Sequence, residues 1–200
     1  RISDMEVNPN AANYDTMYMN VLLIKRTLLM HLVDGAAAHG EHDINRELIQ
    51  PAIKSGSLKV YGYEFEGYYR RIETIKSYFR CNMDLLDYNV RQELFKKSPV
   101  FTKTRDDVPA VYRDGNSVKN SLVADGCVIE GTVENCVLFR GVHIGRNASV
   151  KNAIIMQDSE IEDSVELENV ILDKNVTVRA HGRLIGQVQY PIVIGKNVTL

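Results

Sequence analysis

Between residues 118 and 178, bulky aliphatic residues recur every five or six positions. They are Val118, Val123, Val128, Val133, Leu138, Ile144, Val150, Ile155, Ile161, Leu167, Leu172 and Val178. An amphipathic helix would repeat at three, four and seven positions, and a strand with one buried face would alternate at two. A period near six is instead typical of a parallel β-helix, in which each short strand sends an aliphatic side chain inward before the chain turns a corner. Three strands make a coil of about 18 residues, so this stretch predicts three to four coils.

Ordinary β-hairpins would need alternating faces and repeated two-residue turns such as Asn-Gly, and neither pattern recurs here. The positions between the aliphatic residues are rich in Asn, Asp, Glu and Ser, as the corners and outer faces of a β-helix require. Residues 179–190 depart from the period and predict a loop or an insertion, and residues 192–198 resume the period.

Charge and composition exclude several classes of protein. The 24 basic and 26 acidic residues give a net charge of -2, so a chain-wide basic footprint for nucleic acid is absent. No apolar run reaches the roughly 18 residues of a membrane span. The three cysteines (Cys81, Cys127 and Cys136) are an odd number at irregular spacing, which favours a cytoplasmic protein. The chain begins without Met, in charged sequence and without a secretory signal, which suggests a fragment of a longer protein.

The first half of the chain predicts a mixture of helices and strands. Strands are expected at residues 17–23 and 58–65, and a small-residue loop at 35–40. Helices are expected at residues 25–33, from Asp43 to just before Pro51, at 74–86 and at 89–97. An extended linker at 99–117 then leads into the β-helix, so we expect two domains, at residues 1–97 and 98–200.

Several segments resemble the glucose-1-phosphate adenylyltransferase family. Residues 68–75 read Tyr-Tyr-Arg-Arg-Ile-Glu-Thr-Ile and are similar to its Tyr-Trp-Arg-Asp-Val-Gly-Thr-Leu segment. Residues 82–85 resemble the Asn-x-Asp-Leu helix that follows that segment. Residues 42–51 look like its His-Asp-Phe-Gly-x-Asp-Leu-Ile-Pro segment, and residues 121–129 and 135–139 look like the start of its β-helix.

The resemblance covers nearly all 200 residues and implies a fold and an activity. The implied fold is the C-terminal part of a Rossmann-like nucleotidyltransferase α/β domain followed by a left-handed parallel β-helix of hexapeptide repeats. The family makes ADP-glucose from ATP and glucose 1-phosphate for glycogen or starch synthesis. It uses Mg²⁺ and works as a tetramer under allosteric control.

The departures from the family pattern fall on its substrate and metal positions. Arg71 stands where the family has a metal-binding Asp, and a guanidinium cannot coordinate Mg²⁺, which takes oxygen ligands. Glu73 stands where the family has Gly. Val7 and Asn8 replace the Glu and Lys of a segment that contacts glucose 1-phosphate. Tyr18 replaces a Gly that approaches the sugar, and we expect its ring to fill the space that a substrate needs.

These departures predict a non-catalytic, regulatory type of subunit. It would pair with a catalytic adenylyltransferase subunit, or form a homo-oligomer, through its β-helix. We expect no cofactor in this chain, whereas Mg²⁺ and ATP are expected for the catalytic partner. The family's Gly-rich nucleotide-binding loop has no counterpart in the chain, so this fragment is expected to be inactive by itself.

Two other activities and a purely structural role stay open from the sequence. One is a sugar nucleotidyltransferase of altered substrate, with Asp84 or Glu73 holding the metal. The other is a hexapeptide acyltransferase, with His143 or His181 as the general base. A surface histidine at a corner is the simpler interpretation of either histidine.

Basic residues form two candidate sites for an anion such as a sugar-phosphate effector. One surrounds the start of the helix at 74–86, and the other flanks the linker. Helix-surface charge is the simpler interpretation of the first cluster. The two groups are Arg70, Arg71, Lys76 and Arg80, and Lys96, Lys97, Lys103 and Arg105.

Overall fold

The computed structural model describes residues 1–96, 100–102 and 106–200. The chain forms two compact units, Arg1–Glu66 and Gly67–Leu200. The helices of the first unit are α1 (Arg26–His39), the π-helical η1 (Ile44–Ile49) and α2 (Gln50–Ser55); those of the second are α3 (Ile75–Asp84), α4 (Tyr88–Arg91) and the π-helical η2 (Gln92–Lys96). None of the described helices is long and apolar enough to cross a membrane.

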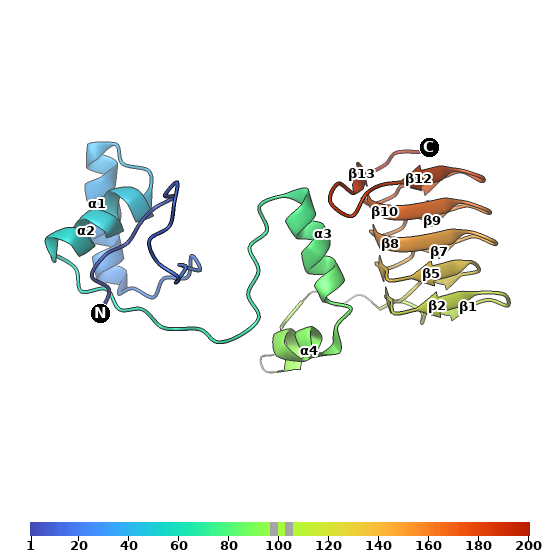
Figure 1. The fold of residues 1–200 in the computed structure, drawn as a ribbon, viewed down its shortest axis with the longest axis horizontal. Helices are drawn as coiled ribbons and strands as arrows, with labels where there is room; N and C mark the ends of the chain where they lie inside the picture. Colours follow the sequence, from blue (N-terminus) through green and yellow to red (C-terminus); the bar gives the residue numbers. More distant parts are fainter. Residues whose placement is uncertain (97–99, 103–105) are drawn as a thin grey trace. The chain divides into compact units, whose positions relative to one another are not determined.

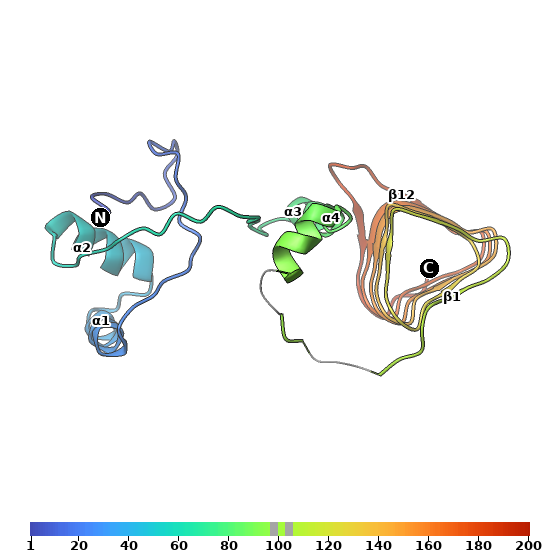
Figure 2. The same cartoon turned by 90° about the horizontal axis from the view of Figure 1, so that it is seen from below.

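Short parallel strands stack in coils in the second unit (Figure 1), and the coils have a triangular cross-section (Figure 2). The strands are β1 (Val111–Tyr112), β2 (Ser117–Lys119), β3 (Leu122–Val123), β4 (Val128–Ile129), β5 (Thr132–Glu134), β6 (Val137–Leu138), β7 (His143–Ile144), β8 (Ser149–Ile155), β9 (Glu160–Ile161), β10 (Glu166–Leu172), β11 (Thr177–Val178), β12 (Arg183–Ile185) and β13 (Ile192–Ile194).

Each side of the triangle is one parallel face. The first face is the sheet β1-β4-β7-β9-β11. Strands β8 and β10 bend around a corner, so each contributes to both of the other faces. The second face contains β2, β5 and β12 with the first halves of β8 and β10, and the third contains β3, β6 and β13 with their second halves.

The pairing register fixes the length of a coil. Most paired residues lie 17 positions apart, as with Thr132 and Ser149. One coil is shorter, because Ser117 pairs with Thr132. The last is longer, because Val170 pairs with Ile192. The predicted hexapeptide β-helix is confirmed, with coils slightly shorter than the expected 18 residues.

The core is a column of side chains along the inside of the coils. Most sides of a coil send two residues inward, two positions apart, and the first is often the smaller, as with Val142 just before β7 and Ile144 within it. Side chains two apart on an extended chain share a face, so one side of a coil supplies two layers of packing. Every predicted aliphatic position belongs to or contacts this column except Val128. Its neighbour Ile129 is buried instead, because the next corner is shortened and Val133 follows only four positions later.

Asparagines occupy the same corner in successive coils. Asn120, Asn135, Asn152 and Asn169 have φ angles of 42°, 53°, 46° and 52°. Asparagine tolerates this left-handed region because its short polar side chain can hydrogen-bond locally. Nδ2 of Asn120 donates to Oδ1 of Asn135 (2.7 Å), and Nδ2 of Asn135 donates to Oδ1 of Asn152 (3.3 Å). The recurring asparagines therefore turn the chain and connect successive coils.

The insertion in the last coil is shorter than predicted. Strand β12 pairs with β10, so the repeat already resumes at Arg183. Leu184 packs against the core column, as an inward position should. The departure from the repeat is confined to residues 186–191, where Gln187 and Tyr190 form an antiparallel bridge.

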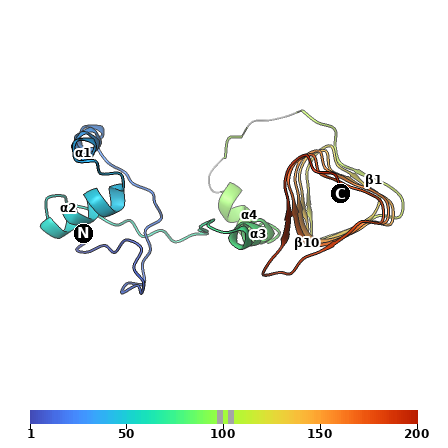
Figure 3. The ribbon, with the colours of Figure 1, turned by 90° about the horizontal axis from the view of Figure 1, so that it is seen from above.

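Helix α3 lies against the outside of the β-helix (Figure 3). It begins with a capping box, in which Oγ1 of Thr74 accepts from the N–H of Ser77 (3.1 Å) and Oγ of Ser77 accepts from the N–H of Thr74 (2.9 Å). Phe79 is buried against Ile154 and Ile171 on the third face. The helix predicted at 74–86 is confirmed, and the one predicted at 89–97 forms as α4 and η2.

The helices of the first unit are longer than predicted. Helix α1 runs on to His39 through the expected loop, because its alanines are strong helix formers, and it ends at Gly40, whose φ is 71°. Asp43 caps η1 as predicted, and its carboxylate accepts two backbone N–H groups. The helical chain does not end before Pro51. Helix α2 follows directly, with Pro51 in its first turn, where a missing N–H is tolerated.

The strands predicted at residues 17–23 and 58–65 do not form. Both segments are extended, but among the described residues of the first unit there is no sheet for them to join. The segment at 58–65 makes two backbone hydrogen bonds, from the N–H of Ile2 to the carbonyl of Val60 (2.9 Å) and from the N–H of Leu58 to the carbonyl of Ala52 (3.3 Å). Leu23 is 100% exposed and Tyr63 is 90% exposed. A strand needs a neighbour for its N–H and C=O groups, so sequence pattern alone was insufficient here. The Rossmann-like part of the expected fold stays a prediction.

The two compact units divide at Glu66 and Gly67. The domain boundary expected from the sequence lies later, between residues 97 and 98. The packing of Phe79 on the third face joins α3 to the β-helix unit, which explains the difference. The expected boundary concerns the family's domains and remains a prediction.

Candidate functional site

Residues 68–73 carry the motif that resembles the family, and they form an extended segment leading into α3. Asp84, at the end of α3, holds the first part of this segment. Oη of Tyr68 donates to Oδ2 of Asp84 (2.8 Å), and Nε of Arg70 donates to the same oxygen (3.0 Å). The Arg70 guanidinium lies over the Tyr68 ring, 5.0 Å from its centroid. We name these three residues the Asp84 clamp.

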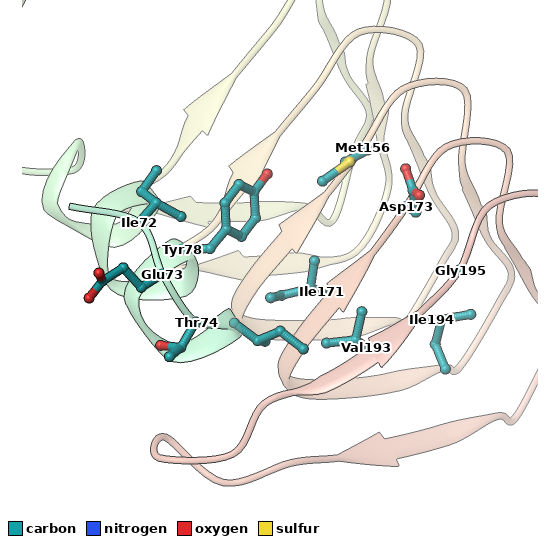
Figure 4. Close-up of a pocket in the computed structure, with 11 residues that line it drawn as sticks. Ile72, Glu73, Thr74, Tyr78, Met156, Ile171, Asp173, Val193, Ile194 and Gly195 are labelled. Atoms are coloured by element: carbon teal, nitrogen blue, oxygen red, sulfur yellow. The ribbon is translucent and has the colours of Figure 1, made fainter. Parts of the chain in front are cut away.

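An ion pair occupies the position where the family resemblance implies a metal ligand. Nε of Arg71 lies 2.9 Å from Oε1 of Glu73, and the two side chains are 45% and 59% exposed. The Glu73 carboxylate points away from the β-helix (Figure 4). The two departures from the family motif therefore balance each other's charge.

These residues do not fit a magnesium ion. Magnesium is usually held by one or two carboxylates together with phosphates and water. The Glu73 carboxylate is paired with Arg71, and the Asp84 carboxylate accepts from Tyr68 and Arg70. In the part of the chain that the structure describes, no group of three or more His, Cys, Asp or Glu side chains could hold a metal. A nucleotidyltransferase that uses Asp84 or Glu73 for its metal is therefore not favoured.

The other predicted substrate positions belong to the first compact unit. Asn8 has a left-handed φ of 50° at a bend before Pro9, and Val7 is half-buried. Tyr18 is 37% exposed within its unit. Arg71 belongs to the second unit, so a single degenerate site made of all these positions stays a prediction.

The basic residues predicted to bind an anion fall into two groups. Lys76 and Arg80 line a groove of about 570 Å³, the far wall of which contains the asparagine corner. Arg70 is already paired with Asp84, which makes it a weaker candidate. Lys96 is exposed at the end of η2. The remaining three, Lys97, Lys103 and Arg105, lie outside the described residues.

A second groove, of about 400 Å³, lies between the start of α3 and the last coils. Ile72 and Tyr78 line it from the α3 side, and Met156, Ile171 and Val193 line it from the β-helix (Figure 4). Its walls are mainly apolar, which suits packing better than chemistry.

The histidines considered as acyl-transfer bases lie away from both grooves. Nε2 of His143, on β7, is 3.6 Å from Glu130, and its Nδ1 is 3.9 Å from Glu160. His181 sits at a corner with a φ of 65° and is exposed. Acyl transfer is therefore not favoured.

Sequence reasoning missed the Asp84 clamp, because Asp84 was considered only as a metal ligand. One signal was available. Tyr68 and Arg70 are two positions apart, so on an extended segment they point to the same side. An aspartate at the end of the following helix is a natural acceptor for both.

The clamp predicts a loss of stability at high pH. Burial, followed by the hydrogen bond to Asp84, raises the pKa of Tyr68 from 10.0 to about 12. The phenol of the unfolded chain loses its proton first, so this stabilisation is complete below pH 10 and is lost as the pH rises towards 12. In urea unfolding, the stability difference between the chain and its Tyr68→Phe variant should shrink from pH 9 to pH 11. The variant Tyr63→Phe, at a side chain that is 90% exposed, is the control. A difference that stays constant would contradict the prediction.

Comparison with known proteins agrees with the resemblance seen in the motifs. The glycogen biosynthesis protein GlgD of Bacillus subtilis (strain 168) is 36% identical over 187 residues, 92% of this chain and 53% of the relative. A glucose-1-phosphate adenylyltransferase of Desulfitobacterium hafniense (strain Y51) is 30% identical over 187 residues, 92% of this chain and 47% of the relative. That of Geobacillus stearothermophilus is 37% identical over 147 residues, 73% and 37% of the two chains.

The β-helix has a match of its own. Residues 108–189 match the family described as GlmU-like, C-terminal hexapeptide. The chain spans about half the length of the first two relatives. Over nearly the whole of its own length, the chain is thus related to GlgD and the glucose-1-phosphate adenylyltransferases, as its motifs predict.

Proposed function

We propose that this chain is part of a regulatory, non-catalytic subunit of a glucose-1-phosphate adenylyltransferase in glycogen synthesis. The ion pair of Arg71 with Glu73 carries the proposal, because a neutralised pair stands where the family resemblance implies a metal-binding carboxylate. A relative at 36% identity is named as a glycogen biosynthesis protein rather than as an adenylyltransferase, which supports the same role. Mg²⁺ and ATP would be bound by a catalytic partner, and no cofactor by this chain.

The subunit would act by assembling with that partner through its β-helix. Two of its relatives are named glucose-1-phosphate adenylyltransferases, so a related catalytic chain or a second copy is the natural partner. The groove beside Lys76 is the proposed effector site. Lys76 and Arg80 supply positive charge for a phosphate, and the carboxamides opposite can both donate to and accept from sugar hydroxyls.

The test is ADP-glucose synthesis by the complete protein that contains this chain, alone and mixed with a catalytic adenylyltransferase from the same source. Alone, we expect a rate about 10²–10³-fold below that of the catalytic protein, as for loss of a group that stabilises the transition state. The mixture should respond differently to sugar-phosphate effectors than the catalytic protein does alone. Lys76→Gln should weaken that response, whereas Lys151→Gln, at an exposed lysine on β8, should not.

Two results would contradict the proposal. One is synthesis by the complete protein alone at a rate near that of the catalytic protein. The other is a mixture whose rate and effector response equal those of the catalytic protein alone.

A further inference from the structure

We infer that residues 68–86 form an arm of the β-helix, and that Asp84 and Phe79 position the Arg71–Glu73 pair relative to the coils. The segment that contains Arg71 and Glu73 would then be held in position by the β-helix and not by the first unit. The regulatory consequence of the inference rests on the proposed function, whereas its structural content does not.

Phe79 attaches the arm to the third face of the β-helix. Its side chain is 6% exposed and packs against Ile154 and Ile171, which are 0% and 4% exposed. Both isoleucines lie outside the core column, next to inward positions such as Ile155. An apolar outer face of this kind needs a cover, and α3 supplies it within the same unit.

The Asp84 clamp then folds the segment before α3 back onto the end of α3. One carboxylate oxygen receives both Tyr68 and Arg70, and the Asp84 side chain is only 24% exposed. Hydrogen bonds to a charged acceptor are stronger than neutral ones, and two of them here share one acceptor. Removing the Asp84 charge would weaken both contacts.

The second end of the segment is held by the cap of α3. The N–H groups of Glu73 and Thr74 both donate to Oγ of Ser77, at 3.0 and 2.9 Å. The Arg71–Glu73 pair therefore lies between two anchors, the clamp and the capping box. A partner that binds the β-helix would thereby set the position of the pair.

Trypsin tests the arm on the full 200-residue chain, because it cleaves after Arg70 and Arg71. We expect Asp84→Asn to speed cleavage at these two bonds by about tenfold or more, since proteolysis follows the population of the opened segment. Cleavage after Lys151 on β8 should not change. The control is Glu166→Gln, which removes an exposed carboxylate 2.8 Å from Arg183 elsewhere on the β-helix.

The outcomes separate the arm from general destabilisation. Unchanged cleavage at Arg70 and Arg71 in Asp84→Asn would overturn the inference, as would equal acceleration at Lys151. A second measurement is a pH titration followed by tyrosinate absorbance. The part of the titration that disappears in Tyr68→Phe belongs to Tyr68. Burial is the largest cause of the raised pKa of Tyr68 and the hydrogen bond to Asp84 is the next, so Asp84→Asn should lower that pKa from about 12. An unchanged pKa would also count against the clamp.

The regulatory consequence is tested in the mixture with the catalytic protein. Asp84→Asn should leave co-purification with the catalytic protein unchanged, because the β-helix is intact, and should reduce the effector response of the mixture. An unaltered response would overturn the coupling. The trypsin result does not depend on any partner, so failure of the arm and failure of the proposed function can be told apart.

Discussion

Replacing Leu172 with alanine should lower the free energy of unfolding by about 2–5 kcal/mol, the usual cost of truncating a buried aliphatic side chain. Leu172 is fully buried and pairs with Ile155 in the coil before it and with Ile194 in the coil after it. The backbone ladders hold both neighbours in place, so neither can move far into the space left by the missing atoms. Truncation should therefore leave a cavity.

Urea unfolding followed by circular dichroism measures this cost. Val188→Ala removes aliphatic atoms from a side chain that is 63% exposed, and it should change stability by less than about 0.5 kcal/mol. Equal effects of the two substitutions would show that the column inside the coils is not the main source of stability.

Replacing Gly145 with alanine should cost about 1–3 kcal/mol, as expected for overpacking against a rigid neighbour. A Cβ at this position would lie 2.7 Å from the carbonyl carbon of Glu162 and from Oδ1 of Asp163, and 2.8 Å from the Asp163 nitrogen. Two of these atoms belong to the backbone of the next coil. They cannot rotate away as the end of a side chain can.

The chain contains a matched control for this substitution. Gly145 lies in the sequence Ile-Gly-Arg-Asn, and Gly195 lies in the similar sequence Ile-Gly-Lys-Asn of the last coil. Among the described residues of this chain, no atom lies within 4 Å of a Cβ built at Gly195, which belongs to the last of the described coils. Gly195→Ala should therefore be nearly neutral in the same unfolding assay. A similar loss of stability in both variants would mean that local backbone preference, and not the neighbouring coil, sets the cost.

The β-helix could be predicted from the sequence because its signal is local and repeated. Each coil places aliphatic residues inside and Asn or Gly at corners, so one error such as Val128 does not alter the result. The position of α3 was harder to predict, since it depends on a face that only the folded coils create. A weak signal was present. Ile154 and Ile155 are consecutive, as are Ile171 and Leu172, and strands with both sides buried read as continuous apolar runs.

The sequence predicted which residue types occupy the candidate site, but not how their side chains are arranged. The charge change at Arg71 was visible in the sequence, but its pairing with Glu73 requires the conformation of the segment. The strand predictions at residues 17–23 and 58–65 were wrong because a strand also depends on a neighbouring strand. Residues 58–65 have the alternating pattern of a strand, but among the described residues no neighbouring strand satisfies the backbone of either segment.

Because the register between coils is fixed, the length of the solenoid is set by its number of coils. Adjacent strands in a sheet lie about 4.7–4.9 Å apart, so the solenoid can lengthen or shorten only in steps of that size. Gain or loss of a coil of about 17 residues between Thr132 and Ser149 would shift everything beyond it by one step. An insertion at a corner, such as residues 186–191, adds residues without changing the length of the solenoid along its axis. Homologous solenoids should therefore differ in span by whole coils, while their loops vary freely in length.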